Sequence, residues 1–390
     1  METTKQFNPG SVRKKFLELF DTSPILIRSP GRINLIGEHT DYNDGYVMPA
    51  AIDRHIFAAI DFSEDAHSTL YSVKHNEFFS FHTSDPAKVK SPLWANYLLG
   101  VVKKFADEGH IVKAFNCVID GDVPTGAGLS SSAALECSFA FALNHLHQFN
   151  ISKIELIQIA QWAEHNYAGV KCGIMDQFSS VMGLEGNAFV LDCRSLEYRY
   201  TPIDLTKCSI VLCDTMVKHS LASSEYNTRR AECEEGVSII RKYYPNVKSL
   251  RDANLTMIEN HRTAFPTKVC NRCTYVIEEN SRVLDASKDL DNRDLASFGK
   301  KMYESHHGLS ELYEVSCDEL DFLVAETKRI PGVLGARMMG GGFGGCTINL
   351  ITKSAVDDFI KIIRRSYQDQ FDVDMKVYIV SLMNGTEQVK

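Results

Sequence analysis

The sequence predicts an α+β fold made of two domains. The chain has 390 residues, and at roughly 150 residues per domain we expect two or three domains. Strand-like runs dominate the early chain, two helical stretches follow, and the second half mixes strands with long charged helices. Because strands and helices do not alternate strictly, this order favours an α+β architecture over repeated βαβ units.

Each element of the first half follows from a local pattern. Helical patterns occupy residues 130–149 and 154–167. The second opens with Ser152 and Glu155 at the spacing of a capping box, which satisfies two free amides at a helix start. The strand-like runs cover residues 25–29, 33–36, 56–60 and 112–119.

The second half begins with a fresh strand. Thr201 and Pro202 precede the strand-like run 208–213, so we place a boundary near residue 205, giving domains 1–205 and 206–390. The remaining predicted elements are helices at 223–243 and 274–288 and strands at 346–351 and 377–382.

Composition and charge exclude several classes of function. The 42 basic and 50 acidic residues give a net charge of −8, whereas nucleic-acid binders usually carry a basic excess. No apolar run approaches the roughly 18 residues of a membrane-spanning helix. The 11 cysteines are scattered and odd in number, which indicates reduced thiols rather than a disulfide framework. We therefore expect a cytoplasmic protein with neither nucleic acid nor a membrane as partner, and we expect a monomer.

The most informative local feature is the glycine- and serine-rich segment 122–134. An apolar strand leads into it, Gly126 and Gly128 relax the backbone, and a helix-forming stretch follows. Free N–H groups at such a helix start, with three serine hydroxyls, can bind a phosphate or a phosphate-bound Mg²⁺. The alternative is an ordinary glycine-rich turn capped by serine. It is not a Walker P-loop, because no Gly-Lys-Ser/Thr follows.

A second glycine cluster spans residues 340–345. Its spacing matches a dinucleotide-binding pattern, but that pattern requires a helix directly afterwards, and residues 346–351 are strand-like. We therefore expect a loop between strands whose backbone passes close to a ligand or to another segment.

Polar residues surround the apolar stretch that follows residue 30. Arg32, Glu38, His39 and Asp41 lie within ten positions of one another. Carboxylate, imidazole and hydroxyl groups at this density suit the hydroxyls of a sugar, since each can form one or two hydrogen bonds. The alternative is a set of polar side chains on the protein surface.

Two further carboxylates and a cysteine pair are candidates for chemistry. Glu164 shares a helix face with apolar residues, so it is a candidate metal ligand unless it reaches water at the helix end. Asp176 lies among apolar neighbours and is a candidate general base, or else a turn-capping residue. Cys270 and Cys273 have the CxxC spacing without a second pair nearby, so we expect two helix cysteines rather than a zinc site.

Taken together, these segments resemble the three motifs of the GHMP kinase superfamily and, within it, the galactokinase family. Residues 30–45 resemble the sugar-binding signature, 124–134 the phosphate loop and 338–346 the third, glycine-rich motif. The similarity extends from about residue 25 to about residue 350. Further stretches resemble the family in the same order, at residues 164–165, 172–178, 192–196 and 221–226.

The resemblance implies a GHMP kinase-like fold of two domains, with the active site between them and a ferredoxin-like second domain. It also implies the reaction. ATP would donate its γ-phosphoryl group to the C1 hydroxyl of α-D-galactose, with Mg²⁺ as cofactor, giving α-D-galactose 1-phosphate and ADP, the first step of the Leloir pathway.

Residue roles also follow from the resemblance alone. Asp176 would be the catalytic base and Arg32 would stabilise the transition state, while Ser132 and Glu164 would bind Mg²⁺. The family usually has threonine where this chain has Met339. The implied galactose contacts are Glu38, His39, Thr40, Asp41, Gly173 and Tyr226. The implied ATP contacts are Ser72, Trp94, Tyr97, Gly126, Ala127, Gly128, Leu129, Ser130, Ser131 and Ser132.

Two rival functions stay open at this point. A sister sugar-1-kinase would act on N-acetylgalactosamine, galacturonate or L-arabinose, which differ from galactose at C2 or C6. A non-catalytic galactose sensor would bind sugar and ATP and signal by protein contact. The intact serine run and Asp176 favour an enzyme over a sensor.

Overall fold

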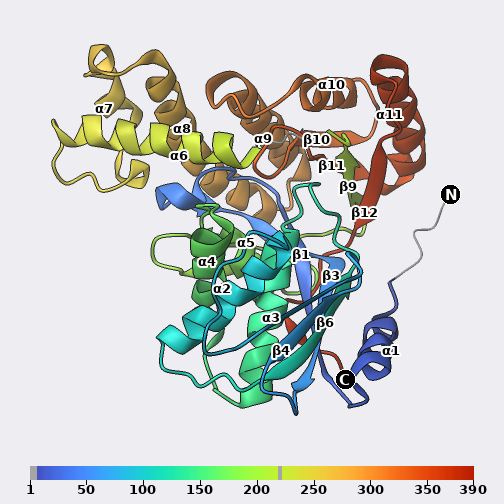
Figure 1. Ribbon diagram of the computed structural model, residues 1–390. Helices are drawn as coiled ribbons and strands as arrows, with labels where there is room; N and C mark the ends of the chain where they lie inside the picture. Colours follow the sequence, from blue (N-terminus) through green and yellow to red (C-terminus); the bar gives the residue numbers. More distant parts are fainter. Residues whose placement is uncertain (1–6, 218–221) are drawn as a thin grey trace.

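Three β-sheets organise the described part of the chain, residues 7–217 and 222–390 of this computed structural model. The largest has the strand order β13-β1-β3-β6-β4-β5, the second β10-β11-β9-β12 and the third β2-β7-β8. In Figure 1 the first sheet lies in the lower half of the molecule and the second in the upper half. Leu221, which opens the stretch 221–226, lies outside the described residues.

The strands are β1 (Ile25–Asn34), β2 (Tyr46–Val47), β3 (Pro49–Phe62), β4 (Ser68–Ser72), β5 (Glu77–Phe81), β6 (Phe115–Gly121), β7 (Asn187–Asp192), β8 (Tyr198–Pro202), β9 (Cys208–Asp214), β10 (Val333–Met338), β11 (Cys346–Thr352), β12 (Lys376–Val380) and β13 (Glu387–Gln388). The α-helices are α1 (Pro9–Phe20), α2 (Leu93–Asp107), α3 (Ser131–His147), α4 (Lys153–Ala163), α5 (Met175–Met182), α6 (Ala222–Arg241), α7 (Leu255–Glu259), α8 (Thr267–Asp291), α9 (Leu295–His307), α10 (Asp318–Thr327) and α11 (Val356–Phe371). Short helical turns are η1 (Asp41–Asn43), η2 (Glu164–Ala168), η3 (Leu250–Asp252), η4 (Arg262–Ala264), η5 (Gly308–Leu312) and η6 (Lys353–Ala355).

Strand β1 joins two runs that the sequence predicts as separate strands. The backbone continues through Gly31, and the register against β3 shifts between Pro30 and Arg32. A Cβ atom on Gly31 would lie 2.8 Å from the Leu129 carbonyl oxygen, which also accepts a hydrogen bond from the Arg32 N–H at 3.2 Å. Because Gly31 has no side chain, β1 approaches the segment after β6 closely at this irregularity.

The glycine- and serine-rich segment is a strand–loop–helix connection, as predicted. It leaves β6 after Gly121 and enters α3 at Ser131. Helices α2, α3 and α4 cover one face of the large sheet, and the apolar side chains between them, such as Leu98, Phe139 and Leu143, are fully buried. The core therefore fixes the axis of α3, whose first turn faces the site described below.

The capping box at the start of α4 is confirmed. The Glu155 N–H donates to the Ser152 hydroxyl at 3.3 Å, and the Ser152 N–H donates to the Glu155 carboxylate at 3.0 Å. The predicted helix 154–167 does not stay an α-helix, because it widens into the π-helical turn η2 at Glu164. Such turns are frequent at functional sites, since the extra residue redirects a side chain.

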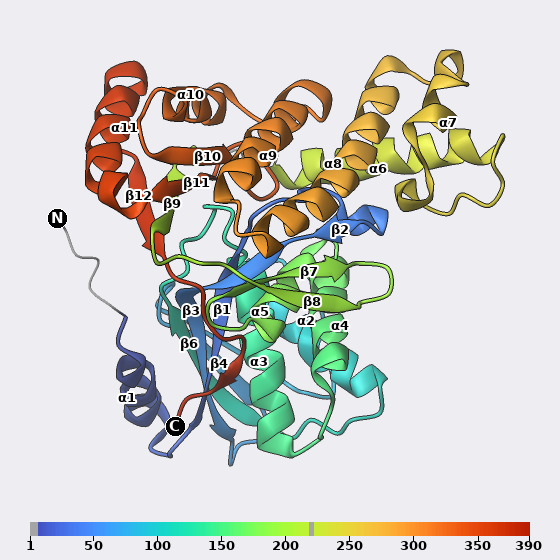
Figure 2. The ribbon, with the colours of Figure 1, turned by 180° about the vertical axis from the view of Figure 1, so that it is seen from behind.

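The second sheet has ferredoxin-like topology, which confirms the expectation for the second half of the chain. In sequence, β9 is followed by helices, then β10 and β11, then α11 and β12, and all neighbours in the sheet are antiparallel. The order β10-β11-β9-β12 is that of a split βαβ arrangement. Helices α6, α7 and α8 extend from this half as an arm (Figures 1 and 2).

The end of the chain returns to the first sheet. Strand β13 pairs with β1, and the Val389 N–H donates to the Leu26 carbonyl at 2.8 Å. Val389 packs beside Val12 and Phe16 of α1, and Figure 2 shows the C terminus next to that helix.

The helices test two predictions from the sequence, that none spans a membrane and that Cys270 and Cys273 share a helix. No helix in the described ranges is long and apolar enough to cross a lipid bilayer. Cys270 and Cys273 lie on α8 as free, buried thiols, so the prediction of two helix cysteines is confirmed.

Candidate active site

A polar cavity lies where the two halves of the molecule meet. We call it the polar cavity, and its walls come from both sides of residue 205. Four of the predicted sugar contacts lie in its wall, together with Arg32 and Asp176. The lining residues are Arg32, Glu38, His39, Asp41, Glu164, Val170, Cys172, Met175, Asp176, Tyr226, Gly340 and Gly341.

Asp176 is held in this cavity by two side chains. It lies in the first turn of α5, and its carboxylate accepts hydrogen bonds from Arg32 Nε at 2.9 Å and from the Ser130 hydroxyl at 2.5 Å. Burial opposes the charge of Arg32, but Asp176 and Glu38 raise its pKa above the ordinary value. A carboxylate and a permanent cation are thus fixed beside the serines at the start of α3.

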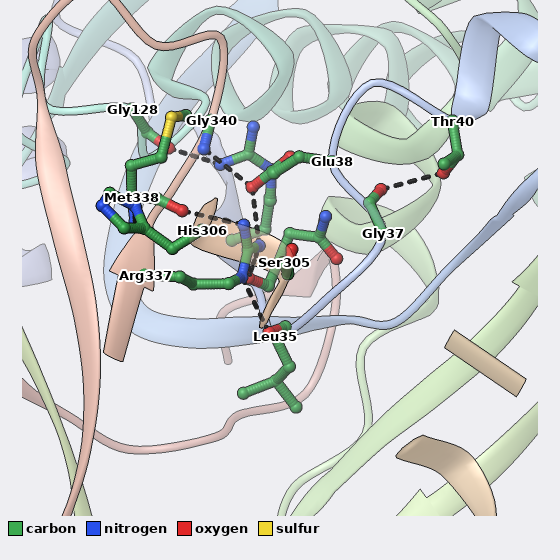
Figure 3. Close-up of polar contacts among 12 residues, drawn as sticks. Leu35, Gly37, Glu38, Thr40, Gly128, Ser305, His306, Arg337, Met338 and Gly340 are labelled. Atoms are coloured by element: carbon green, nitrogen blue, oxygen red, sulfur yellow. Dashed lines mark hydrogen bonds and ion pairs between the residues drawn. The ribbon is translucent and has the colours of Figure 1, made fainter. Parts of the chain in front are cut away.

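Glu38 is oriented by Arg337. Glu38 Oε1 accepts hydrogen bonds from Arg337 Nη2 at 2.9 Å and from the Gly340 N–H at 2.7 Å. Arg337 lies on β10, is fully buried, and also donates to the Leu35 carbonyl at 2.9 Å (Figure 3). Burial opposes the Glu38 charge, but Arg337 and Arg32 lower its pKa below the ordinary value. Glu38 is therefore an ionised acceptor with one oxygen already fixed.

Asp41 and Gly173 pack directly against each other. A Cβ atom on Gly173 would lie 2.0 Å from Asp41 Oδ2, so a side chain at this position would displace the carboxylate. Asp41 Oδ1 accepts a hydrogen bond from the Tyr42 N–H at 3.0 Å. Burial, together with the neighbouring Asp176, raises the pKa of Asp41 to about 7. A hydroxyl that donates to Asp41 would favour the ionised carboxylate, which predominates above that pKa.

His39 presents a buried ring nitrogen to the polar cavity, beside the Gly341 backbone. Its Nδ1 lies 2.7 Å from the Tyr42 hydroxyl, which lies 2.7 Å from the Tyr313 hydroxyl. Its Nε2 is buried and forms no hydrogen bond within the described residues. Burial lowers the pKa of His39 to about 4, so the ring is neutral. With the Tyr226 ring centroid 5.3 Å away, Nε2 is suited to a ligand hydroxyl.

Thr40 is a predicted sugar contact that the structure does not bring to the polar cavity. Its hydroxyl is 2.9 Å from the Gly37 carbonyl oxygen (Figure 3). The same hydroxyl is 2.6 Å from the Tyr46 carbonyl oxygen, and the residue is fully buried. These contacts stabilise the loop that carries Glu38 and Asp41.

Glu164 and Ser132 bring two oxygen donors together. The Ser132 hydroxyl donates to Glu164 Oε1 at 3.0 Å, and Gln177 Nε2 donates to Glu164 Oε2 at 2.6 Å. Burial, with a contribution from Asp176, raises the pKa of Glu164 to about 7, a shift that a bound cation would reverse.

The spacing of these donors fits Mg²⁺. Adjacent ligands of an octahedral ion at about 2.0–2.1 Å lie about 3 Å apart, which matches the distance between Ser132 Oγ and Glu164 Oε1 of 3.0 Å. In the part of the chain that the structure describes, no three His, Cys, Asp or Glu side chains are arranged to hold a metal ion. An ion at this position would therefore need further ligands such as phosphate oxygens and water.

A second cavity, which we call the nucleotide cavity, adjoins the start of α3. Five predicted ATP contacts line it, at Ser72, Trp94, Tyr97, Ser131 and Ser132. Apolar and aromatic side chains form much of its wall, and the two serines bring the helix start to one end. This arrangement suits a planar base joined to phosphates. The other lining residues are Ile56, Lys74, His75, Ile119, Asp120, Gly121, Val123, Thr125 and Leu135.

The loop between β6 and α3 contributes backbone more than side chains. Ala127 and Leu129 are buried in the core between the two halves, so only their main-chain atoms can face a phosphate. Gly126 has open space at its Cβ position, and the Gly128 carbonyl accepts a hydrogen bond from Arg32 Nη1 at 2.5 Å.

The second glycine cluster passes close to other segments, as predicted. A Cβ atom on Gly340 would lie 3.2 Å from Gly128, and one on Gly342 would lie 2.1 Å from the Val315 carbonyl oxygen. Met339, the departure from the family pattern, has its side chain in the core, and its N–H donates to the Cys346 carbonyl at 3.0 Å. The polar cavity is thus lined by the backbone of the cluster and not by the Met339 side chain.

Sequence reasoning missed two residues that hold the site together. Arg337 is the single charge in the strand that leads into the second glycine cluster, and a buried charge in such a strand must be paired. Gln177 follows Asp176 directly and bonds both Glu164 and Glu136. The isolated charge of Arg337 was a usable signal. Gln177 lies in the stretch 172–178 that resembles the family, but no local pattern assigns a role to its amide.

A polar cavity that adjoins a second cavity with a helix start at one end is the arrangement expected of a small-molecule kinase. Sequence profiles agree with this class: residues 96–184 match "GHMP kinases N terminal domain" and residues 286–369 match "GHMP kinases C terminal". A third profile, "Galactokinase galactose-binding signature", matches residues 14–62.

Individual curated relatives narrow the assignment from the GHMP kinases to one family. The chain is 38% identical to "Galactokinase" of Roseiflexus sp. (strain RS-1), covering 97% of both chains. It is 41% identical to "Galactokinase" of Thermotoga maritima, covering 93% of this chain and 99% of the relative. The chain therefore belongs to the galactokinase family.

Solved structures agree on the fold. The crystal structure of Lactococcus lactis galactokinase complexed with galactose superposes with a TM-score of 0.93 at 34% identity, covering 97% of this chain and 99% of that chain. Methanococcus jannaschii mevalonate kinase superposes with a TM-score of 0.66 at 18% identity, covering 93% of this chain and 99% of that chain. The second likeness shows the shared GHMP kinase fold alone.

Proposed function

We propose that this protein transfers the γ-phosphoryl group of ATP to the C1 hydroxyl of α-D-galactose, giving α-D-galactose 1-phosphate and ADP. One observation carries the proposal. The Asp176 carboxylate bonds Arg32 and Ser130 at once, so a hydroxyl bound in the polar cavity can meet a phosphate held at the start of α3. Galactokinase relatives that align along nearly the whole chain support galactose as the sugar.

Asp176 acts as general base in this proposal. It takes the proton of the C1 hydroxyl as that oxygen attacks the γ-phosphorus, while the Arg32 guanidinium offsets charge on the transferring group. Glu38, Asp41 and His39 hold the remaining sugar hydroxyls. Tyr226 lines the same cavity, and Gly173 lies outside its lining, packed against the Asp41 carboxylate. Little covalent chemistry is required, because positioning and charge neutralisation supply most of the acceleration in phosphoryl transfer.

Ser132 and Glu164 are the residues that would hold Mg²⁺. A Mg²⁺ ion held there would supply positive charge that offsets the negative charge of the ATP phosphates. Burial raises the pKa of Glu164 to about 7, so its ionised form needs a nearby positive charge to be stable. This requirement supports the assignment of Glu164 as a metal ligand.

We also propose that the two functional units divide near residue 205 and that the protein works as a cytoplasmic monomer. The start of the ferredoxin-like sheet at Cys208 supports the boundary, although β13 pairs with β1 of the first unit. The cysteines in the described ranges are free thiols, which is consistent with a reducing compartment.

A sugar panel tests the proposed function. Initial rates of ADP release should give galactose a kcat/KM at least about 100-fold above glucose, because a site built on hydroxyl hydrogen bonds leaves its own polar groups unpaired with the wrong epimer. N-acetylgalactosamine, galacturonate and L-arabinose test the sister kinases. A higher kcat/KM for one of them would reassign the substrate, and galactose binding without turnover would indicate a sensor.

Replacing Glu164 with glutamine should raise the Mg²⁺ concentration needed for half-maximal activity by about tenfold or more. Loss of a partner of a metal ligand already costs about 10- to 100-fold, and glutamine keeps the shape but not the charge. Mn²⁺ binding followed by electron paramagnetic resonance, in the presence of ADP, gives a readout besides activity. Glu155→Gln on α4, the helix that leads into Glu164, is the matched control, because glutamine still completes a capping box. Unchanged metal dependence in Glu164→Gln would remove this residue from the metal site.

A further inference from the structure

Two aromatic rings face the nucleotide cavity from different elements. Trp94 lies in the first turn of α2, and His75 lies in the turn between β4 and β5. Their ring planes are parallel to within 4°, and their centroids are 6.4 Å apart. We propose that His75 is a base-contacting residue, and that its imidazole and the Trp94 indole bind the purine of ATP between them. This inference rests on the proposed function, because it takes ATP as the nucleotide.

The separation of the rings suits an inserted base. Stacked bases are spaced about 3.4 Å apart, so a base with a ring on either side requires about 7 Å between the outer rings. The centroid separation of 6.4 Å is the largest spacing that the two ring planes can have, so the exposed His75 ring would move outward by about half an ångström to admit a base. The separation also lies near the far end of the range of about 4.5–7 Å over which aromatic rings interact directly.

The element that presents His75 also fixes Trp94. The Trp94 indole N–H donates to the Glu77 carboxylate at 2.8 Å, and Glu77 begins β5 two residues after His75. On its other side the turn is tied to the segment before α3, because the Lys74 ammonium donates to the Thr125 hydroxyl. Both rings are therefore held relative to the serines that would bind the phosphates.

The rest of the nucleotide cavity is consistent with a base near these rings. Ile56, Ile119, Val123 and Leu135 give it apolar walls, and Ser131 stands at the helix start. His75 itself is exposed in the free protein, whereas Trp94 is half-buried. A planar base would therefore cover the imidazole and bury it against a ring that is already positioned.

Binding measured through Trp94 tests the proposal. The chain has two tryptophans, so a Trp162→Phe background leaves Trp94 as the single indole reporter. In that background His75→Ala should weaken ATP and ADP binding about tenfold, since stacking on one aromatic side chain is worth this order of affinity. Inorganic tripolyphosphate, which has no base, should bind equally well with and without His75.

Other variants separate stacking from a structural role. His75→Phe keeps an aromatic face and should restore nucleotide affinity, whereas His75→Asn keeps polarity and should behave like alanine. The matched control is His67→Ala, which lies just before β4 and outside the nucleotide cavity. In steady-state kinetics His75→Ala should raise KM for ATP and leave kcat and KM for galactose nearly unchanged.

Three outcomes would overturn the proposal. The first is an unchanged dissociation constant for ATP in His75→Ala. The second is an equal loss of affinity for tripolyphosphate, which would assign an electrostatic role to His75. The third is an altered Trp94 emission in the free variant together with failure of His75→Phe to restore binding, which would make His75 a support for Trp94. If the nucleotide binds as expected but no sugar is phosphorylated, the proposed function fails and this inference stands.

Discussion

Asp176→Asn should lower kcat by about 100-fold or more, with the affinities for galactose and ATP changed only modestly. General-base assistance is typically worth on the order of 10²- to 10⁴-fold in rate. Asparagine keeps the shape of Asp176, and its single carbonyl oxygen can still accept the hydrogen bond from Arg32, while its NH2 group can donate to the Ser130 hydroxyl. It cannot accept the C1 proton. Initial-rate kinetics beside calorimetric titration of galactose separate the two effects.

A second substitution tests whether Asp176 and Arg32 act together. Arg32→Ala should be similarly damaging, and the double variant should lose less than the product of the two single losses, because the side chains form one unit. Asp289→Asn is the matched control, since Asp289 pairs with Lys301 away from the polar cavity. If Asp176→Asn keeps most of its kcat, the base lies elsewhere. If it abolishes galactose binding instead, Asp176 anchors the sugar.

Local patterns were sufficient to predict the elements on either side of the glycine- and serine-rich loop. The glycines, the serine run and the apolar strand before them predict a strand–loop–helix connection, which the structure contains between Gly121 and Ser131. The strand-like composition of residues 346–351 likewise excludes a dinucleotide-binding turn, and β11 occupies that position. Both predictions depend on residues adjacent in sequence, where propensity and turn chemistry decide the conformation.

Contacts between distant segments could not be predicted in the same way. Strand β1 continues through Gly31 because that residue packs on Leu129, almost a hundred positions further along the chain. Thr40 has the residue type of a ligand contact, but its hydroxyl serves the Gly37 and Tyr46 carbonyls. Which way a side chain faces depends on tertiary packing, which overrides the local signal.

The contacts of Arg337 also join distant segments and could not be predicted from local sequence. Its replacement has the largest expected effect on stability. Arg337 comes from the second half of the chain, is fully buried, and pairs with Glu38 of the first half at 2.9 Å. It also donates to the carbonyls of Leu35, Asn34 and Met338 at 2.9, 2.6 and 2.8 Å (Figure 3). One side chain thus joins the ferredoxin-like sheet to the loop that carries Glu38.

Arg337→Met should lower the free energy of unfolding by about 3–5 kcal/mol, because breaking a buried ion pair leaves an uncompensated charge on its partner. Chemical denaturation measures this loss, and Arg329→Met is the control. Arg329 pairs with Glu326 at the surface, so its loss should cost about 1 kcal/mol or less.

Adding Glu38→Gln to Arg337→Met removes the unpaired buried charge, so the double variant should be more stable than Arg337→Met alone. If the double variant is instead less stable by the full sum of both single losses, the two side chains are not coupled. In that case, the carbonyl contacts of Arg337, rather than its charge, hold the two halves together.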